Sequence, residues 1–208
     1  MLDPLMRRLI DPPLDRLAAA LERAPFGPDA VTLAGFALGV AAAAANGLDH
    51  GPAALALFAA NRLADGLDGA LARHRGRTGS GAGPSDRGGY IDIVLDFITY
   101  ALLALSFAIR DPVADALPAA FLLASFMGTA SSFLAYAILA GKHGRETSLR
   151  GRKSFYHLGG LTEGTETILF FALCLALPQH FALLAWIFGA ACWLTTLGRV
   201  AAGWRDFS

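Results

Sequence analysis

Apolar residues fill six long segments of the chain, and short polar segments separate them. Each apolar segment approaches the ~20 residues that a helix needs to cross a bilayer. Alanine and glycine are frequent inside the segments, which allows membrane helices to pack closely. No internal repeat relates them, so we expect one all-α integral membrane domain over residues 1–208, with a six-helix core at 30–202. The predicted transmembrane helices lie at residues 30–48, 52–73, 89–109, 117–141, 161–178 and 181–202.

A different pattern precedes the first span. Between residues 2 and 23, apolar side chains recur at helical spacing and arginines occupy other faces. This pattern predicts an amphipathic helix within residues 1–25 that lies at the interface of an anionic leaflet. A surface helix packed on the protein is the alternative. We expect Pro12 and Pro13 to break the segment into two short helices. Acids and prolines leave no uninterrupted apolar core for a secretory signal.

Composition agrees with a membrane protein. Of the 208 residues, 55% are hydrophobic and 16% are charged, whereas soluble domains carry about 25% charged residues. The formal net charge is zero, so it gives no indication of a nucleic-acid partner. We expect membrane lipids and no nucleic acid as partners. Cys174 and Cys192 lie in apolar segments, which favours buried small side chains over a disulfide or a zinc site.

The distribution of basic residues predicts the orientation. Arginine and lysine concentrate before the first span, around the link between the second and third, between the fourth and fifth, and after the sixth. The links on the opposite side contain no arginine or lysine except Arg110. Because basic loops stay on the cytoplasmic side, we expect both termini and the two basic loops to be cytoplasmic. The sequence therefore predicts a multi-pass protein of the cell inner (cytoplasmic) membrane.

Four aspartates interrupt the second and third spans. Asp65 and Asp68 are three residues apart, and Asp92 and Asp96 are four apart, so each pair shares a helical face. A carboxylate at bilayer depth costs on the order of 3 kcal/mol and usually has a function. Antiparallel neighbouring spans would bring both pairs together in the cytoplasmic half of the membrane. Carboxylate oxygens are ligands that Mg²⁺ prefers, and two such ions bind a diphosphate well.

A simpler role for these acids is ion pairing. Asp65 and Asp68 are close enough along the helix to pair with Arg62 and Arg73. We expect this to be a secondary role, with Arg62 orienting an aspartate rather than binding substrate.

The aspartates belong to a longer pattern of eight residues at fixed local spacings. In chain order it reads Asp65-x-x-Asp68-Gly69-x-x-Ala72-Arg73 and Gly88-x-x-x-Asp92-x-x-x-Asp96. This pattern resembles the signature of the CDP-alcohol phosphotransferases, also called CDP-alcohol phosphatidyltransferases. The resemblance covers most of the chain and points to a poorly characterised bacterial branch. It implies that an alcohol attacks the β-phosphorus of a CDP-linked lipid, usually CDP-diacylglycerol, and releases CMP during phospholipid biosynthesis.

The resemblance also implies roles for individual residues. Asp65, Asp68 and Asp92 would be ligands of Mg²⁺ or Mn²⁺, as two ions, and Asp96 would complete the metal site and act as general base. A homodimer is implied as well. The residues implied to bind the CDP donor are Gly69, Ala72, Arg73, Ser85, Asp29 and Thr32.

One departure from the family pattern lies between the two halves of the signature. Fourteen residues separate Arg73 from Gly88, more than the family usually has. The excess, Gly79–Pro84, has the composition of a flexible loop. We expect it to bulge into the cytoplasm rather than cover the nucleotide, and it makes the alignment of Ser85 less direct.

A second polar cluster precedes the fifth span and leaves two interpretations open. Arg152 and Lys153 lie at its cytoplasmic mouth, and Glu163 and Glu166 share a helical face just inside it. These residues would bind the acceptor alcohol, its phosphate or its ammonium group. Alternatively, the basic residues contact lipid headgroups and the glutamates cap the helix start. The sequence does not name the acceptor.

A cation-coupled transporter is the alternative function, because transporters also place carboxylates in the membrane. That class predicts acids near the bilayer midplane and two related halves with broken helices. Here the acids gather toward one face and no halves repeat. We therefore favour the phosphotransferase.

Overall fold

The computed structural model describes residues 3–81, 83–143 and 160–207. Within these residues every regular element is a helix, which confirms the predicted all-α class. The long helices follow the predicted spans closely because each apolar segment forms one helix. The elements are α1 (Asp3–Ala20), α2 (Pro28–Gly47), α3 (Gly51–Thr78), α4 (Asp86–Arg110), α5 (Pro112–Lys142), α6 (Gly164–Ala176), η1 (Pro178–His180) and α7 (Phe181–Asp206).

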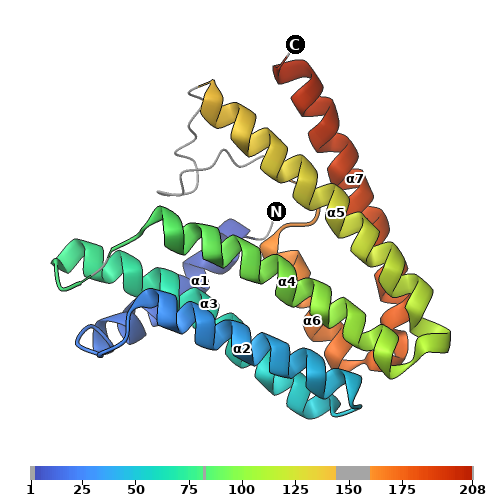
Figure 1. Ribbon diagram of the computed structural model, residues 1–208, viewed down its shortest axis with the longest axis horizontal. Coiled ribbons are helices and arrows are strands. Elements are labelled where there is room, and N and C mark those ends of the chain that lie inside the picture. Colours follow the sequence, from blue (N-terminus) through green and yellow to red (C-terminus); the bar gives the residue numbers. More distant parts are fainter. Residues whose placement is uncertain (1–2, 82, 144–159, 208) are drawn as a thin grey trace.

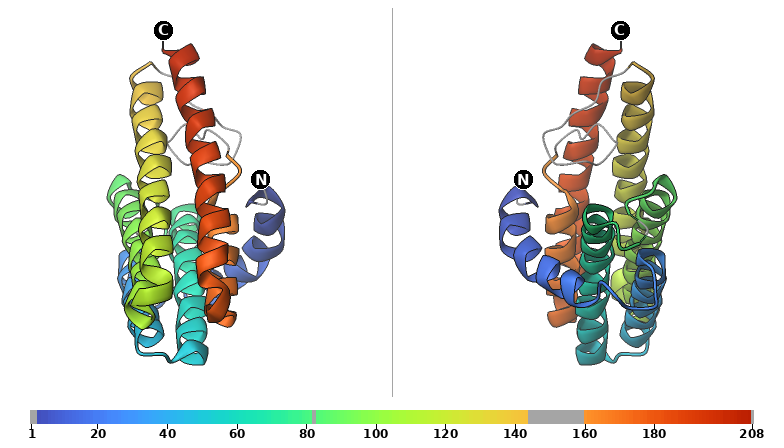
Figure 2. Two further views of the ribbon diagram at one scale, coloured as in Figure 1. Left: turned by 90° about the vertical axis from the view of Figure 1, so that its right-hand side faces the viewer. Right: turned by 90° about the vertical axis from the view of Figure 1, so that its left-hand side faces the viewer.

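Helix α1 differs from the prediction at its prolines. Instead of breaking into two helices, it continues through Pro12 and Pro13, and Figure 2 shows that its direction changes along its length. A proline in a helix removes one hydrogen bond and commonly bends the helix without ending it. The second half is held by packing, because Leu14 and Ala18 are buried against Leu71 of α3 and its neighbours. The predicted break is therefore wrong.

The helices form two groups that meet at a common core. Helices α2, α3 and α4 lie side by side, and α5 and α7 run together away from them, with α6 between the groups (Figure 1). Aromatic side chains join the groups: the rings of Phe107 and Phe181 stack at 4.0 Å, and those of Tyr100 and Phe171 at 5.6 Å. These ring contacts fix α4 relative to α6 and α7.

Glycines on α2 let α3 and α4 approach closely. A Cβ atom on Gly39 would lie 2.7 Å from Cγ2 of Thr99 and 3.1 Å from Nδ2 of Asn61. One turn earlier, the backbone oxygen of Gly35 accepts a hydrogen bond of 2.8 Å from Asn61. Any side chain at Gly39 would push the three helices apart at the level of the acids.

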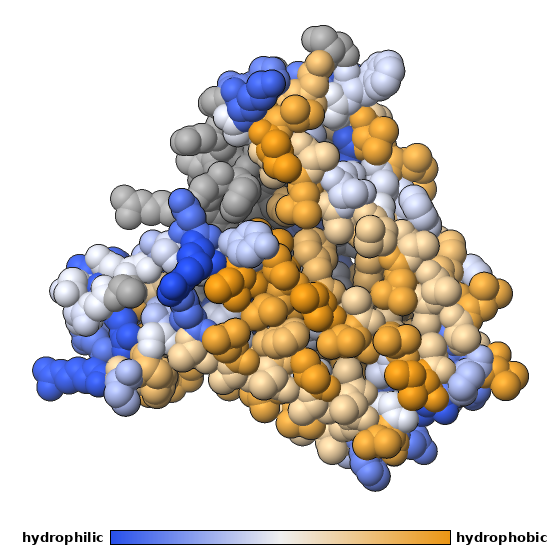
Figure 3. All heavy atoms as spheres, in the orientation of Figure 1, coloured by the Kyte–Doolittle hydropathy of each residue, from blue (hydrophilic) through white to orange (hydrophobic). Residues whose placement is uncertain are grey.

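Four helices of the described residues are long and apolar enough to cross a membrane: α2, α4, α5 and the segment Pro178–Asp206. Helix α3 is 28 residues long but carries the aspartates and several arginines, and α6 has only 13 residues. Apolar side chains cover much of the face in Figure 3, and hydrophilic ones gather at its edges. The fold is therefore that of a helical membrane protein.

Candidate active site

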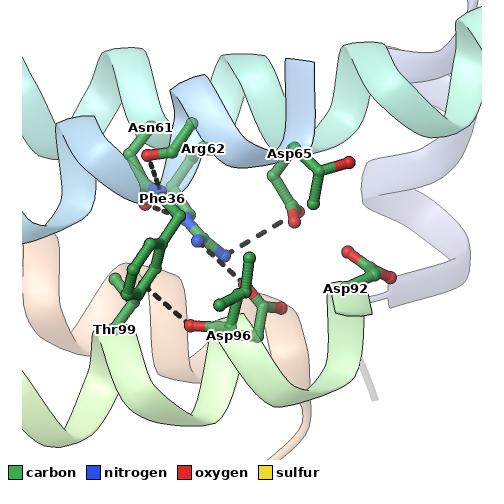
Figure 4. Close-up of a pocket in the computed structure, with 10 residues that line it drawn as sticks. Phe36, Asn61, Arg62, Asp65, Asp92, Asp96 and Thr99 are labelled. Carbon is green, nitrogen blue, oxygen red and sulfur yellow. Dashed lines mark hydrogen bonds and ion pairs between the residues drawn. The ribbon is translucent and has the colours of Figure 1, made fainter. Parts of the chain in front are cut away.

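Three of the four aspartates converge between α3 and α4. Asp65, Asp92 and Asp96 each offer a carboxylate oxygen, and these three oxygens lie within 4.8 Å of one another. Figure 4 shows the three side chains directed toward the same space, Asp65 from α3 and the other two from α4. All three are partly buried. Oxygen donors at this spacing suit a hard divalent cation.

Asp68 lies beside this group and has its own partner. It is buried on α3, and the Thr32 hydroxyl of α2 donates a hydrogen bond to its Oδ2. Thr32 also lines the pocket that contains Asp65, Asp92 and Asp96. Thr32 of α2 therefore connects Asp68, the fourth predicted ligand, to the pocket. The site is built from α2, α3 and α4 rather than from α3 and α4 alone.

Arg62 crosses from α3 to the carboxylates of both helices. Its Nη2 donates a hydrogen bond of 2.9 Å to Oδ1 of Asp96, and its Nη1 lies 3.8 Å from Oδ2 of Asp65. The side chain is only 10% exposed. The predicted pairing of Arg62 with an aspartate is present, and the contact to Asp96 is the shorter of the two.

Arg73 lies over the glycine that follows Asp68. Its Nη1 would be 3.1 Å from a Cβ on Gly69, so the missing side chain leaves room for the guanidinium against the helix. Arg73 is otherwise exposed to solvent. A guanidinium held at an open helix surface offers a forked donor to phosphate oxygens.

Two other residues predicted to bind the CDP donor contact parts of the protein itself. Asp29, at the start of α2, forms an ion pair with Arg87 of α4. The Ser85 hydroxyl accepts a hydrogen bond of 3.0 Å from the Gly88 amide and caps α4. This capping role was not predicted, although a serine directly before a helix is a common N-cap. The pairing of Arg87 with Asp29 was not predicted either.

The additional loop stays close to the end of α3. Helix α3 ends at Thr78, and its C-cap Gly79 adopts a left-handed conformation with φ 71°. The Cα of Gly83 would lie 3.4 Å from a Cβ on Gly76, and Gly81 lies against the Arg75 side chain. In the described part of Gly79–Pro84, the backbone therefore folds back on the last turns of α3. That it bulges into the cytoplasm rather than covering the nucleotide stays a prediction.

The acidic pair of the second cluster stabilises the start of α6. Glu163 and Glu166 form a capping box in which each side chain accepts from the backbone amide of the other; the Glu163 amide lies 3.2 Å from Oε2 of Glu166. The preceding turn is anchored to α7 by Thr195, which accepts from the Leu161 amide at 3.1 Å. Arg152 and Lys153 lie outside the described residues. The predicted helix-capping role is therefore present.

The fold and the carboxylate cluster together define a helical membrane protein with an acidic site shared by three helices. The chain belongs to the CDP-alcohol phosphatidyltransferase family, whose model matches residues 26–198. It is accordingly a CDP-alcohol phosphotransferase, a membrane enzyme of phospholipid biosynthesis that transfers phospholipid headgroups. The resemblance noted in the sequence is confirmed, and the transporter alternative has no support.

Two curated relatives agree with this assignment. The chain is 48% identical over 204 residues to the inner membrane protein YnjF of Escherichia coli (strain K12), covering 98% of this chain and 96% of that protein. It is 35% identical over 102 residues to the archaetidylinositol phosphate synthase of Methanothermobacter thermautotrophicus, covering 49% and 46%. The second match spans about half of each protein.

Solved structures of the phosphatidylinositol phosphate synthase PgsA1 of Mycobacterium tuberculosis share the fold. The complex with CDP-DAG superposes with a TM-score of 0.70 at 22% identity, covering 92% of this chain and 93% of that one. The complex with manganese and citrate gives 0.71 at 22% identity, covering 92% and 88%. At this identity the likeness is one of architecture.

Proposed function

We propose that the protein transfers a phosphatidyl group from a CDP-linked lipid such as CDP-diacylglycerol to an alcohol, releases CMP, and depends on Mg²⁺ or Mn²⁺. The observation that carries this proposal is the convergence of the Asp65, Asp92 and Asp96 oxygens within 4.8 Å. Two PgsA1 structures add support, since one holds CDP-DAG and another holds manganese with citrate.

The carboxylate oxygens of this cluster fit a divalent metal. Ion–oxygen distances of about 2.0–2.6 Å allow ligand oxygens to lie about 3–4 Å apart, so small side-chain rotations of Asp65, Asp92 and Asp96 would close the site. Asp68, one turn along α3, would serve as a further ligand, and we propose two ions. Metal ions bound there would neutralise charge on the diphosphate and on the attacked phosphoryl group.

Asp96 is the proposed general base. The acceptor hydroxyl oxygen forms a new bond to the β-phosphorus, the bond from that phosphorus to CMP breaks, and the hydroxyl proton moves to the Asp96 carboxylate. Arg62 donates to Oδ1 of Asp96 and so holds the carboxylate in place.

The donor is proposed to lie along the start of α2 and the end of α3. The Gly69 and Ala72 positions provide small residues beside the exposed Arg73 guanidinium, which would bind the phosphates. The contact of Thr32 with Asp68 links the α2 start to the acids. Asp29 and Ser85 are proposed to face the nucleotide as well, from positions where they now hold Arg87 and the start of α4.

The proposed arrangement in the membrane has six spans in one domain, with the charged α3 and the short α6 added to the four apolar helices. The termini and the active site face the cytoplasm, and α1 lies at the interface. The name of the E. coli relative, an inner membrane protein, supports the location. We also propose a homodimer, as the family resemblance implies.

The function is tested by incubating purified protein with radiolabelled CDP-diacylglycerol and a panel of acceptors. The panel contains glycerol 3-phosphate, inositol phosphate, serine, inositol and phosphatidylglycerol. We expect CMP release with at least one acceptor, loss of release in EDTA, and recovery with Mg²⁺ or Mn²⁺. Absence of CMP release with every acceptor would contradict either the donor or the reaction.

For the acceptor, we propose a site around the start of α6, formed by Arg152, Lys153, Glu163 and Glu166. Glu166→Gln keeps an oxygen for the Glu163 amide but removes a negative charge. We expect a rise of about tenfold in the KM for the acceptor, the loss of one charged hydrogen bond, with little change for CDP-diacylglycerol. Equal changes in both KM values would assign the glutamates to helix capping alone.

A further inference from the structure

The Arg62 guanidinium has an unusual position for a cation beside a metal site. It contacts Oδ1 of Asp96 at 2.9 Å and Oδ2 of Asp65 at 3.8 Å, and both aspartates belong to the three-carboxylate group. A cation that binds these carboxylates therefore meets a permanent positive charge on the same ligands. Arginine keeps this charge at every accessible pH.

The guanidinium is fixed from every side that the structure describes. Its Nε donates to Oδ1 of Asn61 at 2.7 Å, and its Nη1 donates to the Tyr100 hydroxyl at 2.9 Å. It also lies over two aromatic rings, 5.1 Å from the centroid of Tyr100 and 5.8 Å from that of Phe58. Together with the contact to Asp96, these contacts involve all three nitrogen atoms of the guanidinium.

The anchors themselves contact neighbouring helices. Asn61 is buried and donates to the Gly35 backbone of α2, and Tyr100 stacks on Phe171 of α6. The position of the guanidinium is thus set by α2, α3, α4 and α6 together. Such rigid contacts point to a charge whose place matters, since a neutral packing residue would fill the same space without a desolvation cost.

We propose that Arg62 is a positioning residue and a resident counter-cation of the acidic site. It holds Asp96 in the orientation that the reaction needs, and it weakens the binding of divalent cations to the cluster. This inference rests on the proposed function, because it assumes that Asp65, Asp92 and Asp96 bind metal. It adds a determinant of metal affinity that is no metal ligand itself.

The two effects of Arg62 have opposite signs, which makes them separable. Removing the positive charge raises the affinity for Mn²⁺, because a unit charge about 5 Å from a divalent ion opposes binding by about tenfold even with the dielectric constant of water. Removing the paired N–H groups of the guanidinium releases the Asp96 carboxylate from its position, and this slows the reaction. A residue that only supported the fold would reduce both properties together.

The test measures Mn²⁺ binding by electron paramagnetic resonance and CMP release on the same detergent-purified samples. For Arg62→Gln we expect the Kd for Mn²⁺ to fall about tenfold and CMP release at saturating metal to fall about tenfold or more. Arg62→Lys retains the charge but not the fork, so its Kd should stay within about twofold of the wild type while CMP release falls.

Arg110→Gln is the matched control. Arg110 is also poorly exposed on α4, pairs with Asp115 at 3.6 Å and lies over the Phe107 ring, but at the end of the helix away from Asp92 and Asp96. We expect this variant to change stability alone, with the Kd for Mn²⁺ and CMP release per folded molecule as in the wild type.

An unchanged or higher Kd for Mn²⁺ in folded Arg62→Gln would overturn the inference, as would full activity of Arg62→Lys. If Arg62→Gln does not fold, Tyr100→Phe decides the positioning role: it removes one anchor of the guanidinium and should lower CMP release about threefold at unchanged Kd, and unchanged release would overturn it. Failure of the wild type itself to bind Mn²⁺ would instead contradict the proposed metal site.

Discussion

Asp96→Asn should reduce CMP release by about a thousandfold while the protein stays folded and membrane-inserted. The asparagine has nearly the shape of the aspartate, and its amide oxygen can still accept the hydrogen bond from Arg62 that Asp96 accepts at 2.9 Å. It cannot take a proton from the acceptor hydroxyl, and general base catalysis contributes about 10²–10⁴-fold. The loss therefore falls on the chemical step rather than on folding.

This expectation is measured with radiolabelled CDP-diacylglycerol at saturating acceptor and Mn²⁺, alongside the thermal unfolding midpoint in detergent. Asp115→Asn is the matched control, because Asp115 is a buried aspartate that also pairs with an arginine. We expect the control to lower the midpoint but to keep CMP release per folded molecule. If Asp96→Asn retained a tenth of the wild-type rate, Asp96 would not be the base.

The convergence of three acids was partly predictable because it depends on local periodicity. Residues three or four apart share a helical face, so Asp92 and Asp96 necessarily point the same way from α4. Asp65 comes close to them because α3 and α4 both pack against α2. The shared face of each aspartate pair is visible in the order of apolar and polar residues, whereas the packing of both helices on α2 is not.

The position of Asp68 was harder to predict from the sequence. It accepts a hydrogen bond from Thr32, which lies 36 positions away and is brought there by the close approach of α2 at Gly35 and Gly39. Glycines are frequent in the whole chain, so nothing local distinguishes the ones that permit a helix contact. The three-helix character of the site is a property of packing.

Polar residues at helix starts were ambiguous for another reason. Ser85, Glu163 and Glu166 have both a possible substrate role and an N-terminal capping role, and the same hydrogen-bonding atoms would serve either. The structure shows the capping contacts. Because backbone amides at a helix start always need acceptors, capping was the physically required role, and substrate binding remains an addition to it.

Arg75 illustrates what a sequence pattern does not contain. It is 6% exposed, and its guanidinium donates to four backbone oxygens of the segment that leads from α1 to α2. Backbone oxygens belong to every residue type, so no sequence signal marks them as partners. The acceptors are the carbonyls of Leu21 at 3.3 Å, Glu22 at 3.2 Å, Ala24 at 3.0 Å and Phe26 at 3.0 Å.

These contacts give Arg75 a role opposite to that of Arg73, two residues earlier on the same helix. Arg73 is exposed over Gly69, whereas Arg75 ties down the connection that carries the chain into α2, just before Asp29 and Thr32. Donors to helix-end carbonyls also interact favourably with the helix dipole. One arginine is thus exposed at the proposed donor site, and the other holds the connection from α1 to α2 beside it.

Replacing each arginine by alanine should separate these roles. Arg75→Ala loses four hydrogen bonds of a buried charge, so we expect a loss of about 3 kcal/mol in the free energy of unfolding and a fall of about 5 °C or more in the unfolding midpoint. Arg73→Ala should leave the midpoint within about 1 °C and raise the KM for CDP-diacylglycerol about tenfold. The unfolding midpoints are measured by tryptophan fluorescence during thermal unfolding in detergent. The KM is measured by titrating CDP-diacylglycerol at a temperature below the lower of the two variants' midpoints. Equal destabilisation by the two substitutions would make Arg73 a structural residue, and an unchanged midpoint in Arg75→Ala would show that the α1–α2 connection is held by other contacts.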